Sequence, residues 1–289
     1  MKNRNLVWLL AVMVLVSCQN RSSAEKKTVL NAISFNIRQN GPDDGINNWV
    51  NRKEMAADVF LDYGIDIAGL QEVNKQQLDD LDGLLPGYAH VGVGRVDGKT
   101  AGEYSPIYYR KEKLRLLESG TQWLSETPEA VGSMGWDAAY PRIFTWGKFK
   151  YNANGRVFYF FTTHFDHMGE EARVQSSSLL LSKVEELTGG GLPVIITGDF
   201  NFTSDKEAYG IMTRTGDPLT FHDSKDITKT SFTGKPSSVS RWGKPGPSFI
   251  IDYIFVNEGI GVEEYNILAI KKDGVYVSDH WPVMSILSF

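Results

Sequence analysis

Eight residues with carboxylate, amide or imidazole side chains stand at the ends of short apolar runs in this 289-residue chain. Carboxylate and amide oxygens bind hard divalent cations, and imidazoles exchange protons near neutral pH. Together such groups can neutralise a phosphoryl group, activate a water molecule and protonate a leaving oxygen. A set of these residue types can therefore support metal-assisted hydrolysis of a phosphoester. The eight residues are Asn36, Glu72, His164, Asp199, Asn201, Asp252, Asp279 and His280.

The apolar runs that precede these residues predict strands, because each is short and rich in β-branched or aromatic residues. Loops at the ends of rigid strands usually carry function, so we expect the polar residues to gather there. Asn201 follows Asp199 by two residues in an expected extended stretch, and its side chain should therefore point to the same side. The expected strands cover residues 29–35, 65–70, 157–163, 193–197 and 249–251.

Helical patterns lie between these runs. Apolar residues recur at spacings of three and four, and the glycines at 189–191 should end the last helix. Strand-like segments fill most of residues 103–150. Helices and strands that interleave in this way indicate the α/β class. The expected helices cover residues 51–61, 76–85 and 170–187.

Any one of the eight residues alone is typical of a turn or a helix cap, but the sequence around them forms an ordered series of motifs. The series is Ala32–Arg38 (AISFNIR), Gly69–Val73 (GLQEV), Thr162–His164 (TTH), Gly198–Asn201 (GDFN), Asp252–Phe255 (DYIF) and Ser278–Val283 (SDHWPV). It resembles the endonuclease/exonuclease/phosphatase superfamily, which includes deoxyribonuclease-I-like nucleases, neutral sphingomyelinases, inositol polyphosphate 5-phosphatases and tyrosyl-DNA phosphodiesterases. The resemblance runs from about Thr28 to Phe289.

The resemblance implies an α/β (α+β) fold of four layers, an α-β-β-α sandwich. Two mixed, mostly antiparallel sheets would pack face to face, with helices on the outer faces and a Mg²⁺ or Mn²⁺ site at one edge of the sandwich. By the same resemblance, Glu72 is the principal metal ligand, with Asn36 and Asp279 nearby as ligands of the metal or of its water. Oxygen ligands of this kind suit a hard cation that keeps several waters.

The catalytic roles that the resemblance implies fall on five residues. Asp199 matches the carboxylate that orients or activates the attacking water, and Asn201 can hold a phosphoryl oxygen. His280 matches the histidine that contacts the scissile phosphate, with Asp252 as the carboxylate that orients it. His164 matches a histidine near the leaving group. Which histidine is the acid and which is the base stays open.

Further segments resemble exported bacterial members of the superfamily and supply candidate substrate-binding residues. The guanidinium of Arg142 is planar and pairs well with phosphoryl oxygens. Glu103 fits a structural ion pair as well as a place in the pocket, and His167 fits a supporting place beside the catalytic groups. The aromatic residues near 123, 136 and 140 would form a pocket wall or pack between the sheets. The four candidate substrate-binding residues are Glu103, Tyr109, Arg142 and His167.

The N-terminus has the pattern of an export signal. Lys2 and Arg4 precede an apolar run over residues 6–16, which is too short to span a bilayer. The run ends in Leu-Val-Ser-Cys at 15–18, which resembles the bacterial lipoprotein cleavage signal, in which the cysteine receives lipid. A secretory signal with an incidental cysteine is the alternative. The expected division is a signal peptide over 1–17, a lipidated Cys18 with a polar tether over 18–27, and a catalytic domain over 28–289.

The composition is that of an acidic globular chain, with a formal net charge of −5 and 42% apolar residues. Proteins that grip long nucleic acid usually carry a basic face, so this balance disfavours nucleic acid as a partner. Cys18 is the only cysteine, and the chain therefore cannot form an internal disulfide. Residues 19–22 lack an acidic run of the kind that resembles surface-export signals, which favours the periplasmic face of a bacterial cell envelope. We expect a monomer.

The leading hypothesis is hydrolysis of a small or lipid-linked phosphoester or phosphodiester outside the cytoplasm, by an enzyme that a lipid anchor holds at the membrane. A secreted nuclease is the alternative within the superfamily, where nucleases are common. A non-catalytic binding lipoprotein on the same scaffold is a remote alternative, because every expected metal and acid-base position is filled.

The anchor hypothesis makes a prediction about Cys18. The substitution Cys18→Ala should release the protein from membranes or stall its processing, because buried acyl chains hold a protein far more tightly than a short polar tether does. Fractionation of cells that express each form measures this. Membrane association that is equal in both forms would contradict the lipid anchor.

Overall fold

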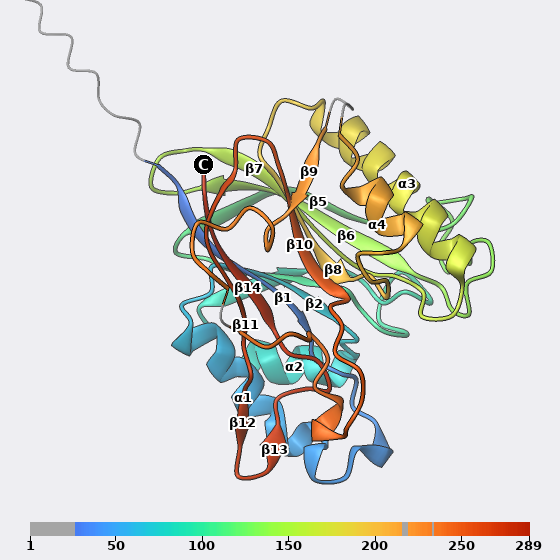
Figure 1. Cartoon of the computed structure of the whole chain (residues 1–289), viewed down its shortest axis with the longest axis vertical. Helices are drawn as coiled ribbons and strands as arrows, with labels where there is room; N and C mark the ends of the chain where they lie inside the picture. Colours follow the sequence, from blue (N-terminus) through green and yellow to red (C-terminus); the bar gives the residue numbers. More distant parts are fainter. Residues whose placement is uncertain (1–26, 216–218, 233) are drawn as a thin grey trace, which may run out of the picture.

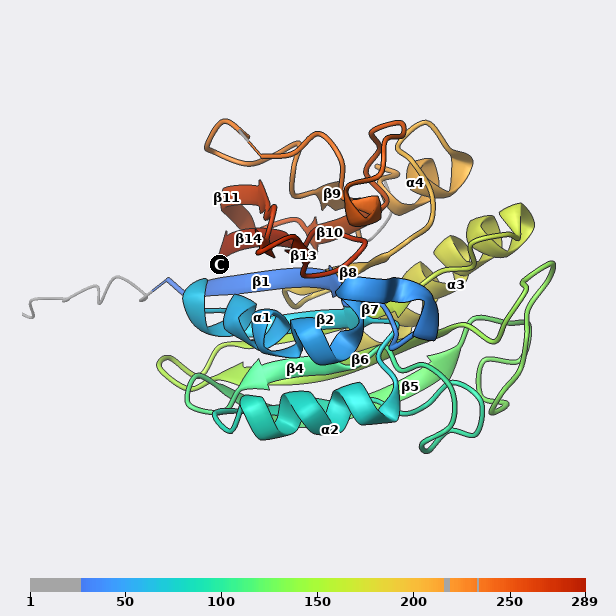
Figure 2. The ribbon, with the colours of Figure 1, turned by 90° about the horizontal axis from the view of Figure 1, so that it is seen from below.

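Two six-stranded sheets lie face to face at the centre of the fold (Figures 1 and 2). The computed structural model describes residues 27–215, 219–232 and 234–289. In spatial order, the first sheet consists of β11 (Gly261–Ile267), β14 (Val283–Ser288), β1 (Val29–Asn36), β2 (Ile67–Gln71), β4 (Ile107–Arg110) and β3 (Tyr88–Val91). The second consists of β5 (Leu114–Trp123), β6 (Ile143–Tyr151), β7 (Val157–His164), β8 (Val194–Asp199), β10 (Asp252–Asn257) and β9 (Phe221–Asp223).

Helices cover the outer face of each sheet. On the first sheet, α1 (Trp49–Asp62) and α2 (Lys75–Leu84) bury their apolar faces in the core that the strands share with them. On the second, α3 (Glu170–Thr188) and α4 (Glu207–Met212) do the same. Short elements complete the chain: the 3-10 turns η1 (Pro42–Asn47) and η2 (Arg241–Gly243), and a hairpin of β12 (Lys271–Lys272) and β13 (Val275–Tyr276). The four-layered α-β-β-α fold expected from the sequence is confirmed.

Each sheet is mostly antiparallel and contains one parallel pair, β1 with β2 in the first sheet and β7 with β8 in the second. Parallel strands deliver their carboxyl ends to the same edge of a sheet. Asn36 and Glu72 therefore follow neighbouring strands of one sheet, and His164 and Asp199 end neighbouring strands of the other. Because the sheets are stacked, the two sets of ends can meet at one edge of the sandwich.

The three helices expected from apolar spacing are confirmed as α1, α2 and α3, and α3 ends at Gly189, which has a left-handed φ of 61°. The strand expected at 249–251 is wrong, since β10 begins only at Asp252. Backbone donors of this segment bond to serine hydroxyls instead of a strand: Ser237 Oγ accepts from the Phe249 N–H, and Ser238 Oγ accepts from the Ile251 and Asp252 N–H groups. Asp252 therefore stands at the start of a strand.

The predicted signal segment and the lipidation site at Cys18 lie outside the described residues. Within the described ranges, no helix combines the length and the apolar character needed to cross a membrane.

The two sheets pack closely at Gly69 in β2. A Cβ atom at this position would lie 2.1 Å from Thr197 Oγ1 and 2.4 Å from Thr162 Oγ1, which belong to the opposite sheet. Beside it, the buried Gln71 Nε2 donates a 3.0 Å hydrogen bond to Thr162 Oγ1. Only glycine leaves room at this position for the two threonine side chains of the opposite sheet.

We predict that Gly69→Ala lowers the free energy of unfolding by about 3 kcal/mol, because the added methyl group has no free space between the sheets. Gly83→Ala is the matched control, since a Cβ at Gly83 on the exposed face of α2 meets nothing within 4 Å. That control should raise stability by up to about 1 kcal/mol. Chemical denaturation of both variants measures the difference, and equal stabilities would contradict the close approach.

Candidate functional site

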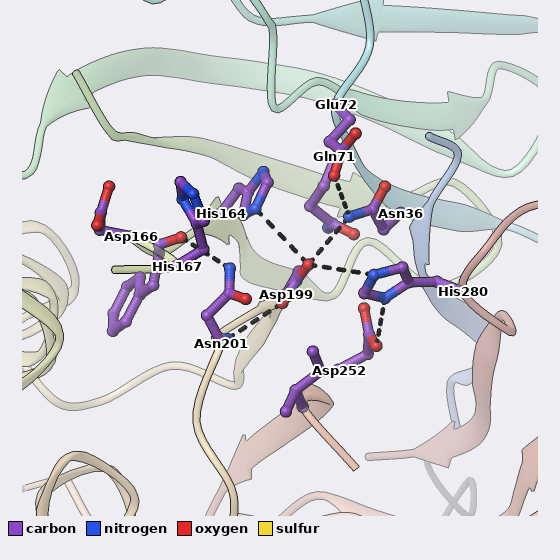
Figure 3. Close-up of polar contacts among 12 residues, drawn as sticks. Asn36, Gln71, Glu72, His164, Asp166, His167, Asp199, Asn201, Asp252 and His280 are labelled. Atoms are coloured by element: carbon purple, nitrogen blue, oxygen red, sulfur yellow. Dashed lines mark hydrogen bonds and ion pairs between the residues drawn. The ribbon is translucent and has the colours of Figure 1, made fainter. Parts of the chain in front are cut away.

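Several of the predicted site residues converge on Asp199, a buried carboxylate at the end of β8 (Figure 3). Its Oδ2 accepts a 2.9 Å hydrogen bond from Asn36 Nδ2, and the same amide nitrogen donates to Glu72 Oε1 at 3.0 Å. Two imidazoles face the same oxygen, with His164 Nε2 at 3.6 Å and His280 Nε2 at 3.8 Å. Asp199 therefore lies between two histidines and is joined to Glu72 through one amide.

The structure brings together the predicted pair of Asp252 and His280, which are separated by 27 residues of chain. Asp252 Oδ2 lies 2.9 Å from His280 Nδ1, so Nδ1 carries the proton that bonds the carboxylate. The antiparallel register of β8 and β10 places Asp252 directly opposite Asp199. Burial opposes the charged form, but the Asp252 and Asp199 carboxylates raise the pKa of His280 well above its usual range.

A second carboxylate faces the other histidine. Glu103 Oε2 lies 3.8 Å from His164 Nδ1, and the guanidinium of Arg95 holds both oxygens of Glu103 at 2.8 and 3.0 Å. Burial lowers the pKa of His164 well below its usual range, and the nearby Arg142 and Arg95 charges lower it further. His164 is thus held as a neutral imidazole while His280 favours the charged form. The two histidines beside Asp199 have opposite electrostatic environments.

Burial raises the pKa of Asp199, and the neighbouring Asp252 carboxylate raises it further. Burial also disfavours the charge on Glu72, but the hydrogen bond from Asn36 and the charges of His280 and Arg38 bring its pKa below the usual value. Asp199 is therefore the carboxylate with greater proton affinity, and Glu72 is the one that keeps its charge.

Glu72 reaches the site through a backbone turn. Its φ is 60°, in the left-handed region, where a residue with a side chain is strained by about 1–3 kcal/mol. The turn lets Glu72 Oε2 accept from the Gln39 N–H at 3.2 Å and from Arg38 Nη1 at 3.4 Å. The strained residue is therefore the one that the resemblance predicts as the principal metal ligand.

Asn201 differs from its expected conformation. We expected an extended stretch, but Asn201 has a left-handed φ of 52°. Its N–H donates to Asp199 Oδ1 at 3.1 Å, and its Nδ2 donates to the Phe165 carbonyl at 3.0 Å. Asn201 still lines the pocket beside Asp199, but a turn closed by the Asp199 carboxylate places it there.

Two of the predicted metal residues lie beside Arg38. The Asn36 Oδ1 accepts from the Arg38 N–H at 2.9 Å, while its Nδ2 donates to the carboxylates of Glu72 and Asp199. Asp279 Oδ2 lies 3.9 Å from Arg38 Nε, and the Asp279 side chain is 25% exposed. Two groups of possible ligand atoms that each lie within 4.8 Å of one another occur among the described residues, one of Glu72, His164 and Asp199 and one of Asp199, Asp252 and His280.

These residues border a pocket of about 740 Å³. Three of the four predicted substrate-binding residues, Glu103, Arg142 and His167, line it. The prediction for Tyr109 is wrong: it does not line this pocket, its ring packs 5.1 Å from that of Phe149, and its backbone pairs with Ile67. Ile67 begins β2, whereas the site lies at the other end of that strand, so Tyr109 belongs to the core.

Several residues that line the pocket were not predicted from the sequence, among them Arg38, Lys75 and Arg95. Arg38 ends the first motif, which could have drawn attention to it. Arg95 lies in a loop that contains none of the motifs. Its position in the pocket wall becomes apparent only from its two hydrogen bonds to Glu103. For Tyr140, the sequence leaves two places open, the pocket wall or the core between the sheets. In the structure Tyr140 lines the pocket, with 51% of its surface exposed.

We compared the chain with family models, with curated proteins and with solved structures. Residues 33–280 match the Endonuclease/Exonuclease/phosphatase family. No curated protein matches the chain.

Several solved structures are similar over most of the chain. An endonuclease/exonuclease/phosphatase from Bacteroides vulgatus is 41% identical, with a TM-score of 0.86, and the match covers 90% of this chain and 98% of that one. A family protein from Bacteroides thetaiotaomicron is 36% identical, with a TM-score of 0.83 and coverage of 91% and 99%. A mannosyl-6-phosphatase from Bacteroides thetaiotaomicron is 36% identical, with a TM-score of 0.82 and coverage of 90% and 100%.

We predict that Asp252→Asn lowers the pKa of His280, because the amide removes the neighbouring negative charge that stabilises the imidazolium. A raised histidine pKa stabilises the folded state fully below the unfolded value of about 6.5, and this contribution is lost as pH rises through the folded value. The variant should therefore lose stability chiefly at acidic pH. Histidine NMR titration of the metal-free protein measures the pKa, with His90, which lies outside the pocket, as the internal reference. An unchanged pKa of His280 in the variant would show that Asp252 does not raise it.

Proposed function

Because the chain belongs to the endonuclease/exonuclease/phosphatase family of phosphoesterase and nuclease hydrolases, we propose that it is a divalent-metal-dependent phosphoesterase that acts outside the cytoplasm on a small phosphorylated substrate. The observation that carries the proposal is the arrangement around Asp199. One buried carboxylate faces a neutral and a positively biased histidine at the floor of a pocket, with a charged Glu72 beside it.

The donor set fits a hard divalent cation. Glu72 and Asp199 are neighbouring carboxylates that share one amide hydrogen-bond donor, and Glu72 also faces the guanidinium of Arg38 at 3.4 Å. Glu72, which keeps its charge, would be the principal ligand of Mg²⁺ or Mn²⁺, and Asn36 and Asp279 would bind the metal or its water through oxygen, which leaves Asp199 to act on the attacking water. The cation would supply Lewis-acid polarisation of the phosphoryl group.

The protein's own groups support the remaining chemistry. Asp199 has a raised proton affinity, which suits a base that takes a proton from an attacking water. His280 carries a proton stabilised by Asp252, and its Nε2 can donate to a phosphoryl or leaving oxygen. His164 is held neutral, so it can orient a group without adding charge. Asn201 lines the same pocket, where it can hold a phosphoryl oxygen, and Arg142, which already bonds Asp166 and His167, lines the pocket wall.

A small phosphomonoester is the favoured substrate class. A relative with 36% identity over 90% of this chain is a mannosyl-6-phosphatase, and we extend that substrate type, a sugar phosphate, to this protein. A pocket of about 740 Å³ has the size of a small-molecule site. The acidic net charge of −5 disfavours the alternative of a nuclease, which would gain affinity from a basic surface.

The direction of β1 supports a soluble substrate if Cys18 anchors the protein. The described chain begins at Lys27, and β1 leads from Val29 to the site residue Asn36 at its far end (Figure 2). An eight-residue strand spans roughly 25 Å at about 3.3 Å per residue. The N-terminal attachment and the pocket therefore lie at opposite ends of the strand. An anchored domain would hold its pocket away from its point of attachment rather than against lipid headgroups.

We predict that Glu72→Gln lowers the turnover of a phosphomonoester by at least about 100-fold, because the amide keeps the size of the side chain and removes the charge that balances the metal. The assay uses hexose phosphates, nucleic acids and phosphorylated lipids as substrates, with Mg²⁺ or Mn²⁺ supplied. Glu118→Gln, an exposed change in β5, is the matched control and should leave turnover unchanged. Equal wild-type activity in EDTA and in Mg²⁺ would contradict metal dependence, and strong cleavage of duplex DNA alone would favour the nuclease.

A further inference from the structure

Beyond the groups around Asp199, six connected side chains form a continuous arc along the pocket wall. They come from three loops: the one between β3 and β4, the one between β5 and β6, and the one after β7. We call this set the recognition arc. Four of its members, Arg95, Glu103, Arg142 and His167, line the pocket together with Tyr140, and the sixth, Asp166, lies directly behind them.

One half of the recognition arc joins a charged pair to two rings. Arg95 forms its two-pronged ion pair with Glu103, and its guanidinium also lies 5.4 Å from the ring centre of Tyr140. The Tyr140 ring lies nearly parallel to that of His167, with ring centres 5.9 Å apart and planes inclined by 14°. These contacts tie the three loops together, so the rings are held in place before a ligand arrives.

The other half fixes the hydrogen-bonding state of His167. Arg142 Nη2 lies 3.0 Å from His167 Nδ1, and Arg142 Nε donates to Asp166 Oδ2 at 3.2 Å. A guanidinium can only donate, so His167 Nδ1 must accept and its proton must sit on Nε2. Asp166 in turn accepts from the Met168 and Gly169 N–H groups, which anchors this half to the backbone. The exposed ring of His167 thus offers an N–H donor.

The charge balance of the recognition arc separates two kinds of ligand. Arg95 is paired with Glu103, and Arg142 is paired with the buried Asp166. With His167 in its neutral tautomer, the arc carries two positive and two negative groups. A second phosphate or carboxylate would find no uncompensated charge here. Hydroxyl groups, which both donate and accept, match the His167 N–H, the Tyr140 hydroxyl and the remaining lone pairs of the carboxylates.

We propose that the recognition arc binds the leaving group of the substrate and selects an uncharged, hydroxyl-rich ring such as a pyranose. Tyr140 and His167 are then specificity-determining residues. A site that is built to bond hydroxyl groups discriminates strongly against a ligand that lacks them, because its own polar groups are left unpaired. This inference rests on the proposed phosphoesterase function and deepens it by assigning the part of the site that recognises the alcohol.

The test compares hexose 6-phosphates with n-hexyl phosphate, which has the same chain length and ester type and no other hydroxyl. The variants are Tyr140→Phe and His167→Phe, which keep an aromatic ring and remove polar atoms. We expect wild type to prefer the hexose esters, and each variant to lower the ratio of the two kcat/KM values about tenfold, mainly through KM, as one hydrogen bond to a neutral group does. Tyr63→Phe, a partly exposed tyrosine at the end of α1, is the control and should leave the ratio unchanged.

The outcomes separate the inference from the function on which it rests. If wild type cleaves both esters equally, or if neither variant changes the ratio, the enzyme is a phosphoesterase and the recognition arc does not select hydroxyl groups. If wild type cleaves no phosphoester, the proposed function fails. In that case, hexose 6-phosphates are titrated into the metal-free protein and followed through the His167 ring signals. Binding that weakens in Tyr140→Phe supports the recognition arc, and absent or unaltered binding overturns it.

Discussion

The site depends on one side chain that connects the two sheets. Asn36 ends β1 in the first sheet, and its amide nitrogen donates both to Glu72 of that sheet and to Asp199 of the other. Two carboxylates in a buried place repel each other, and a donor shared between them lowers that cost. This bridge forms only where the sheets lie close enough for one short side chain to span the gap. The packing of the sandwich and the chemistry of the pocket therefore have a common cause.

Residues behind the site allow the two sheets to pack closely. Gly69 leaves room for Thr162 and Thr197 of the opposite sheet, and Gln71 bonds across the same interface. On the outer side, the buried Arg52 donates to the carbonyls of Ile37, Arg38, Asn47 and Val277. It thereby ties the loop after β1 to the segment that leads into Asp279 and His280. A guanidinium satisfied by carbonyls fixes backbone positions, and the site loops are held from within.

The electrostatic roles arise from burial and neighbours more than from residue type. His164 and His280 are the same amino acid, yet two guanidinium groups near His164 and two carboxylates near His280 shift their pKa values in opposite directions. The pKa values of the two carboxylates also shift in opposite directions. Burial and Asp252 raise that of Asp199, whereas hydrogen bonds and positive charge lower that of Glu72. Separated proton affinities of this kind are what a hydrolase requires of its acid, base and charge-bearing groups.

The resemblance of the motif series predicted the four-layered fold and the polar residues at the pocket floor, and apolar periodicity predicted the three long helices, because motifs and periodicity are local properties of the chain. Tertiary structure decided the rest. Asp252 stands opposite Asp199 because β10 runs antiparallel to β8, Asn201 reaches the pocket through a left-handed turn, and Tyr109 falls in the core because β4 carries it away from the site. Arg95 pairs with Glu103 across a loop that has no sequence signature. These positions depend on register and on contacts between distant segments, and residue spacing along a chain does not encode the distance between two strands that fold together from far apart.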